Sequence, residues 1–114
     1  MRVSDGFRAF VLDQLSGVRG MRAKDMFGGI GLYADDVFFG ILASDVLYLK
    51  VDETNRTDYE RAGSKPFKPY RDRPGTMQYY AVPLDVLESP MDLARWARAA
   101  ISAAERKRAI SGDG

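Results

Sequence analysis

The sequence contains no cysteine and no histidine. Without cysteine there is no disulfide framework, which agrees with a reducing compartment. Zinc sites built from cysteine and histidine ligands are excluded by the same absence. No serine lies in a nucleophile motif either. We therefore expect a protein that is not an enzyme, with no catalytic residue, no metal site and no cofactor.

Long apolar runs and an excess of one charge are also missing. No apolar segment approaches the roughly 18 residues that cross a bilayer. The N-terminus, MRVSDGFRAF, lacks the apolar stretch and cleavage site of a secretory signal. Seventeen lysines and arginines against sixteen acidic residues give a net charge of +1, so the whole chain has no electrostatic attraction for a polyanion. The sequence predicts a cytoplasmic protein that does not enter a membrane.

The composition is that of one ordinary globular domain. The chain has 114 residues, of which 46% are hydrophobic and 29% are charged. A chain of this length buries roughly 65% of the surface that its unfolded form exposes, which suffices for one core. We assign residues 1–108 to a single domain and residues 109–114 to a disordered tail.

The first half of the chain predicts one helix followed by strands. Ser4 is placed to cap a helix that ends near Leu15. Its apolar side chains recur at helical spacing, at Phe7, Phe10, Val11 and Leu15. Gly28 and Gly29 then indicate a bulge or a close approach of two backbones. Strands are expected at 22–27, 30–34, 37–42 and 46–51, the last three joined by tight connections that include a hairpin turn at Asp35 and Asp36.

The second half predicts two helices separated by strands. A short, exposed helix is expected at 54–62, with Tyr59 and Ala62 on one side and Gly63 closing it. Prolines allow only an edge strand at 67–70, followed by a loop to Thr76. The last strand is expected at 77–82 and a turn at 83–88. Ser89 and Pro90 then start a helix to about Arg108, whose inner stripe is Leu93, Ala97, Ala100 and Ala104, with Trp96 alongside.

Five short motifs can be compared together with known families. They are Met26-Phe27-Gly28-Gly29, Leu47-Tyr48-Leu49-Lys50, Pro66-Phe67, Tyr79-Tyr80 with Val82-Pro83, and Leu93-x-x-Trp96-Ala97. In this order and spacing the chain resembles the N-terminal domain of the TfoX/Sxy family of bacterial competence regulators. The resemblance extends from about Phe7 to Ala104.

The resemblance implies an α+β fold of the secretion-chaperone-like type. This fold has an antiparallel sheet of about five strands with flanking helices, in the order α-β(3)-α-β(2)-α. The family's competence regulators act as accessory regulators of transcription alongside the cyclic-AMP receptor protein, and they have no established catalytic residues. They also carry a C-terminal helical domain that this chain does not reach, so we expect a standalone N-terminal domain.

One segment favours a different function, direct binding of nucleic acid. Lysines and arginines alternate with aromatic residues there, a composition typical of single-stranded nucleic-acid grooves. The candidate contacts are Lys65, Phe67, Lys68, Tyr70, Arg71 and Arg73. Prolines and positive charges also protect edge strands from aggregation, and the two aromatic residues can help to close a core. Both interpretations remain open, and we expect any nucleic-acid binding to be weak.

Three other patterns have simpler structural explanations. GIGLYA at 29–34 satisfies a dinucleotide fingerprint, but a strand rather than a helix is expected after it. The adjacent carboxylates Asp35-Asp36 and Asp52-Glu53 are typical of solvated turns. The cluster from Arg106 to Arg108 is typical of a solvated helix end.

Strand alternation predicts an interface. It places Val37, Phe39 and Ile41 on one side of the sheet and Phe38 and Leu42 on the other. Neither face is polar enough to be solvated. We therefore predict that the face carrying Phe38, Tyr48, Lys50 and Tyr80 is at least partly an interface, in a homodimer.

Taken with the resemblance, the sequence predicts a non-catalytic protein-interaction module in transcription regulation. The resemblance implies a protein partner that is part of the transcription machinery or a regulator. Nucleic-acid binding through residues 65–73 is the first alternative. Binding of a small molecule, or an enzymatic activity without a recognisable motif, is the second.

Overall fold

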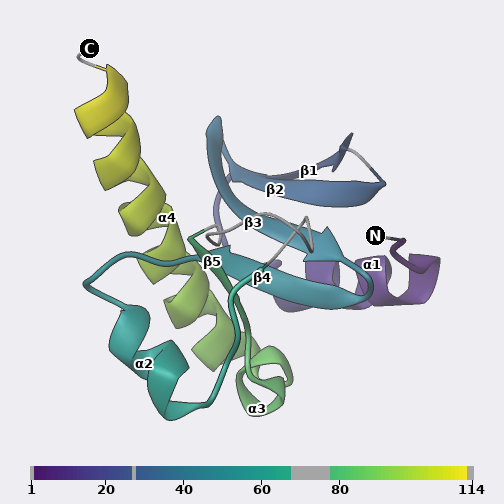
Figure 1. Ribbon diagram of the computed structural model, residues 1–114. Coiled ribbons are helices and arrows are strands. Elements are labelled where there is room, and N and C mark those ends of the chain that lie inside the picture. The colour runs from purple at the N-terminus through teal and green to yellow at the C-terminus, as the bar shows by residue number, and fades with distance from the viewer. Residues whose placement is uncertain (1, 27, 68–77, 113–114) are drawn as a thin grey trace.

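The computed structural model describes residues 2–26, 28–67 and 78–112 (Figure 1). Within these ranges the fold is α+β, with an antiparallel sheet of five strands in the order β1-β2-β3-β4-β5. The strands are β1 (Met21–Met26), β2 (Gly29–Ala34), β3 (Val37–Ala43), β4 (Val46–Lys50) and β5 (Tyr79–Ala81). The helices are α1 (Asp5–Gln14), α2 (Arg56–Arg61), α3 (Leu84–Leu87) and α4 (Pro90–Gly112). The predicted class, the five-stranded sheet and its flanking helices are confirmed.

The distribution of strands differs from the implied order α-β(3)-α-β(2)-α. Four strands precede α2 and one follows it within the described residues. β1 is a full strand because it pairs with β2 over its whole length, from Met21 opposite Ala34 to Met26 opposite Gly29. After α2, Pro66 forms an isolated bridge to Tyr80, held by hydrogen bonds that the Phe67 N–H donates to the Tyr79 carbonyl oxygen and the Ala81 N–H donates to the Lys65 carbonyl oxygen. The rest of the strand expected at 67–70 and the loop to Thr76 lie outside the described residues.

The two long helices start where their capping residues predict. The Ser4 Oγ accepts a hydrogen bond from the Phe7 N–H at 3.2 Å, and the Ser89 Oγ accepts one from the Asp92 N–H at 3.3 Å. Phe10 is 41% exposed, so its predicted place on the buried stripe of α1 is wrong. The predicted burial of Val11 and Leu15 is confirmed, since both are fully buried in the main core, and Phe7 packs against that core.

The shorter helices follow local signals. α2 buries Tyr59, and Gly63 at φ 71° ends it as predicted. Ala62 is exposed, contrary to prediction, because α2 contacts the core through Tyr59. α3 occupies the expected turn. α4 continues past Arg108 to Gly112, into the segment expected to be disordered.

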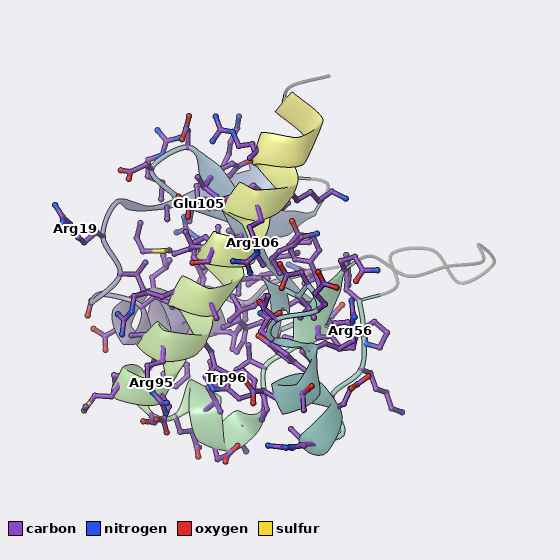
Figure 2. The ribbon with its side chains drawn as sticks, turned by 90° about the vertical axis from the view of Figure 1, so that its left-hand side faces the viewer. Arg19, Arg56, Arg95, Trp96, Glu105 and Arg106 are labelled. Atoms are coloured by element: carbon purple, nitrogen blue, oxygen red, sulfur yellow. The ribbon has the colours of Figure 1, made fainter. Side chains whose placement is uncertain are left out.

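The main core lies between one face of the sheet and helices α1 and α4, which Figure 1 shows on the same side of the sheet. The predicted inner stripe of α4 is confirmed, since its members are all buried: Leu93, Ala97, Ala100 and Ala104. They meet the fully buried Leu32, Phe39, Leu42 and Leu49 of the sheet. Each such leucine contributes roughly 1.5–3 kcal/mol by its removal from water. Trp96 of α4, seen in Figure 2, packs edge-on against Tyr59 with 4.7 Å between ring centroids and joins α2 to the core.

Two tight turns connect β2 to β3 and β3 to β4, and one of them also binds the residue before α1. Asp35 has φ 55°, which confirms the hairpin turn predicted there. Ser44 and Asp45 both have positive φ, at 51° and 56°, as a two-residue type I′ turn requires. The Asp45 Oδ1 accepts a hydrogen bond from the Ser4 N–H at 2.7 Å, so this turn also holds the first residue before α1.

In the described part of the chain, no helix is both long enough and apolar enough to pass through a bilayer.

Candidate functional site

The second face of the sheet carries a cluster of aromatic side chains. Ile41, Ala43, Phe67 and Tyr79 are buried in it, and Phe38 and Tyr48 pack against them with part of their surface exposed. Ring centroids lie 5.3 Å apart for Tyr33 and Phe38, 5.6 Å for Phe38 and Tyr79, and 4.8 Å for Tyr48 and Phe67. We call these five aromatic residues the aromatic face. None of the described helices contributes to this cluster.

A β-bulge decides which residues of β3 reach the aromatic face. Leu32 pairs with Gly40 and Tyr33 with Phe38, so Phe39 has no partner on β2. The extra residue reverses the alternation beyond it. Ile41 therefore shares the side of Phe38, and Leu42 joins the main core. The prediction for Ile41 and Leu42 is wrong, because it assumed unbroken alternation along β3.

The predicted interface residues divide between the two faces. Phe38 and Tyr48 lie in the aromatic cluster, and Lys50 lies beside it over Tyr79. Tyr80 lies on the other face of the sheet. It pairs with Leu49 and packs in the main core, with 5.8 Å between its ring centroid and that of Tyr59. Its neighbour Tyr79 takes the predicted place. The register between β4 and β5, which joins segments far apart in the chain, makes this choice.

Lys50 is a buried cation at the end of β4. It is 6% exposed, and its Nζ lies 5.2 Å from the centroid of the Tyr79 ring. Burial lowers the pKa of Lys50, and the nearby charge of Lys107 lowers this pKa further, while Asp52 opposes the shift. Burial also raises the pKa of Tyr79 to about 12, so its ring stays uncharged below the alkaline range.

Lys50 lines a hollow of about 510 Å³ between the end of β4, α2 and the C-terminal part of α4. Its charged lining residues are Lys50, Asp52, Glu53, Arg56, Arg106 and Lys107. We call it the basic pocket. Figure 2 shows Arg106 on α4 and Arg56 at the start of α2, the two elements that flank it. Sequence reasoning noted Arg106 and Lys107 only as part of a basic helix end and missed this pocket, because its four cations come from three separate segments of the chain.

The basic cluster at the end of α4 is partly paired, where a solvated helix end was predicted. The Arg106 Nε donates to Asp52 Oδ2 at 2.9 Å, and Arg108 donates to both carboxylate oxygens of Asp36 at 3.1 and 3.0 Å. Arg108 lowers the pKa of Asp36 by its hydrogen bond and its charge. These carboxylates belong to the two acidic pairs noted in the sequence. They connect α4 to two turns, and such exposed pairs stabilise a fold by at most about 1 kcal/mol.

The predicted nucleic-acid segment is described only at its start. Lys65 is exposed, whereas Phe67 is 7% exposed and packs on Tyr48, so its ring faces the protein. Lys68, Tyr70, Arg71 and Arg73 lie outside the described residues. Binding of nucleic acid through this segment stays a prediction.

The glycine fingerprint at 29–34 is strand β2, followed by another strand, as expected. A Cβ on Gly29 would lie 2.7 Å from the Leu42 carbonyl oxygen. Gly29 therefore permits a close approach of β2 to β3, one of the two roles predicted for these glycines, and it does not cradle a phosphate.

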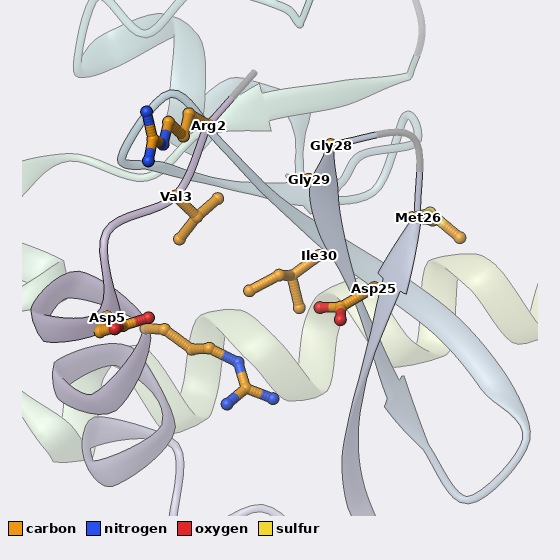
Figure 3. A pocket seen from close by; sticks show the side chains of 9 residues that line it. Arg2, Val3, Asp5, Asp25, Met26, Gly28, Gly29 and Ile30 are labelled. Atoms are coloured by element: carbon orange, nitrogen blue, oxygen red, sulfur yellow. The ribbon is translucent and has the colours of Figure 1, made fainter.

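A second hollow of about 590 Å³ separates the N-terminal segment from the β1–β2 hairpin. Figure 3 shows Arg2 and Asp5 on one side of it and Asp25 and Ile30 on the other. Its charged lining consists of two arginines, Arg2 and Arg8, and two aspartates. These charges balance, so the hollow has no net preference for an anion or a cation.

Comparison with known proteins agrees with the five motifs. No curated protein matches the sequence. The family model described as the TfoX N-terminal domain matches residues 13–104, which is most of the chain and all five strands. The chain therefore belongs to the TfoX N-terminal domain family.

Proposed function

We propose that the chain is a non-catalytic protein-interaction module that acts in the cytoplasm as an accessory regulator of transcription. Membership of the TfoX N-terminal domain family supports the regulatory part of this proposal. The aromatic face supports the interaction part, and it is the single observation on which the proposal depends.

The aromatic face has the composition of a contact surface. Phe38, Tyr48 and Tyr33 are partly exposed there, and tyrosine and phenylalanine are enriched in protein interfaces. An antiparallel sheet normally has one face on the core and one polar face in water. On the second face, the side chains of β3, β4 and β5 are apolar apart from Lys50 and the tyrosine hydroxyls, while β1 adds the exposed Arg22 and Lys24 at its edge. A protein surface that covers it would bury the exposed parts of these rings.

Capture of partners from the native cytoplasm tests this proposal. We expect the tagged full chain to retain a component of the transcription machinery. Phe38→Glu places a charge in the centre of the aromatic face and should abolish this capture. Met91→Glu is the matched control, because Met91 is 82% exposed on α4 and lies outside that face. Equal capture by wild type and Phe38→Glu would contradict the proposal.

Nucleic-acid binding through residues 65–73 is less well supported, because Phe67 is buried and cannot stack on a base without leaving the cluster. Four phosphate contacts would give log affinity a slope against log salt of roughly −3 for a single strand. We expect instead weak binding at physiological salt, and a slope of log affinity against log salt that is smaller in magnitude than this value.

A further inference from the structure

The ammonium of Lys50 lacks an acceptor among the described residues. The ion pairs described for the chain involve Arg95, Arg106 and Arg108, and none involves Lys50. The Tyr79 ring 5.2 Å away offers a cation–π contact. The stem of Lys50 is buried while the side chain lines a hollow, and a cation in such surroundings is stabilised by an anion close to it. This side chain lines the basic pocket, so an anion in that pocket would supply the missing partner.

The charges of the basic pocket leave a surplus of two positive charges. Its lining has four cations (Lys50, Arg56, Arg106 and Lys107) and two carboxylates (Asp52 and Glu53). Arg106 and Asp52 neutralise each other at 2.8 Å. Arg56 donates to the neutral Gln78 Oε1 at 3.2 Å and keeps its charge. Three cations and one carboxylate remain, and a dianion would neutralise their net charge of +2.

We propose that the basic pocket binds a phosphate-bearing small molecule, with Lys50, Arg56 and Lys107 around the phosphate group. A phosphate monoester carries about −1.5 to −2 charges at neutral pH, whereas a carboxylate would leave one cation without a partner. Lysine meets phosphate as a point charge and arginine as a planar fork, so the residue types suit this group. A volume of about 510 Å³ lies within the range of small-molecule sites.

Titration of the full chain with inorganic phosphate, at constant ionic strength maintained with sodium chloride, tests the site. We expect saturable amide shifts in NMR spectra at Val51 and Ala103, which line the pocket, and a millimolar affinity. Adenosine 5′-monophosphate should bind at least as tightly as inorganic phosphate. Shifts that follow ionic strength alone, or none at all, would overturn the proposal. Tighter binding of a single-stranded oligothymidine at the same residues would assign the pocket to nucleic acid and would also overturn it.

Substitutions locate the binding. Lys50→Met keeps the unbranched stem over Tyr79 and removes the charge, so the affinity for inorganic phosphate should fall by at least about tenfold. Lys24→Met is the matched control, since Lys24 is exposed on β1 and does not line the pocket, and its affinity should not change. If Lys50→Met does not fold, Lys107→Ala decides the question, because Lys107 is exposed on α4. An unchanged affinity in Lys107→Ala would overturn the proposal.

The basic pocket and the aromatic face can be tested separately. Phe38→Glu should abolish partner capture and leave phosphate binding intact, because Phe38 does not line the basic pocket. Loss of phosphate binding in this variant, with the fold retained, would show that the pocket does not bind phosphate on its own and would overturn the proposed assignment.

Discussion

Tyr59 buries a hydroxyl that has no hydrogen-bond partner among the described residues. The side chain is 1% exposed, so the hydroxyl has lost its water as well. Removing an unsatisfied buried group recovers part of a desolvation penalty of about 1–3 kcal/mol. We predict that Tyr59→Phe leaves the free energy of unfolding unchanged or raises it by about 1 kcal/mol, measured in urea. Tyr59→Leu, which loses the contacts with Trp96 and Tyr80, should destabilise the fold. A loss above 1 kcal/mol in Tyr59→Phe would reveal a partner for the hydroxyl.

Tyr59 also makes the free energy of unfolding depend on pH in the alkaline range. Burial raises the pKa of Tyr59 in the folded state, and the nearby Asp58 raises it further. The unfolded chain therefore releases this proton first, near pH 10. The contribution of Tyr59 is fully present below that pH and is lost as the pH rises above it. We predict that wild type loses stability above about pH 10 more steeply than Tyr59→Phe, followed by thermal unfolding at fixed ionic strength. Parallel curves for the two proteins would contradict this.

Trp96 connects two helices through one contact. Its ring packs edge-on against Tyr59 and is only partly buried. We expect Trp96→Ala to cost about 3 kcal/mol, the lower end of the range for tryptophan removal, because solvent can fill part of the space. Met91→Ala on the exposed side of α4 should cost less than about 0.5 kcal/mol. A cost below about 1 kcal/mol for Trp96→Ala, measured in urea, would show that the contact contributes little.

At the scale of elements, β2 and β3 depend on Gly29. A Cβ at this position would lie 2.7 Å from the Leu42 carbonyl oxygen, so the backbone must shift to accept it. We predict that Gly29→Ala costs about 1–3 kcal/mol. Gly6→Ala is the matched control in α1, because nothing lies within 4 Å of its Cβ position. This control should stabilise the chain by a few tenths of a kcal/mol to about 1. Equal effects of both substitutions in urea unfolding would contradict the prediction.

Local signals explain which elements could be predicted from the sequence. Ser4 and Ser89 cap helices through bonds to residues three positions away, and the stripe of α4 follows from helical period alone. The bulge at Phe39 and the side taken by Tyr79 depend on register between strands. Register is set by tertiary packing, so alternation within one strand could not give it. The basic pocket could not be predicted either, because tertiary packing brings its three chain segments together.

At the scale of the whole molecule, the two faces of the sheet differ in what covers them. α1 and α4 cover the face with Leu32, Phe39 and Leu49, while no described helix joins the cluster on the other. A second copy of the chain could cover the aromatic rings, because Lys50 beside them is itself buried and the exposed charges of Arg22 and Lys24 lie at the β1 edge of this face. A two-fold axis through the aromatic face would pack the rings of one copy against the same rings of the other. Two-fold symmetry is the commonest symmetry of homo-oligomers.

We therefore predict that the purified chain, without its protein partner, forms a homodimer through the aromatic face. Light scattering after size exclusion at high micromolar concentration should give the mass of two chains for wild type and for Met91→Glu. Tyr48→Glu and Tyr33→Glu place a carboxylate among the partly exposed rings and should give the mass of one chain. Tyr33→Glu matters because Tyr48 also packs on Phe67 and its substitution disturbs that internal contact. If wild type is a monomer and neither substitution changes its mass, the aromatic face does not bind a second copy. The protein partner captured from the cytoplasm would then be its occupant.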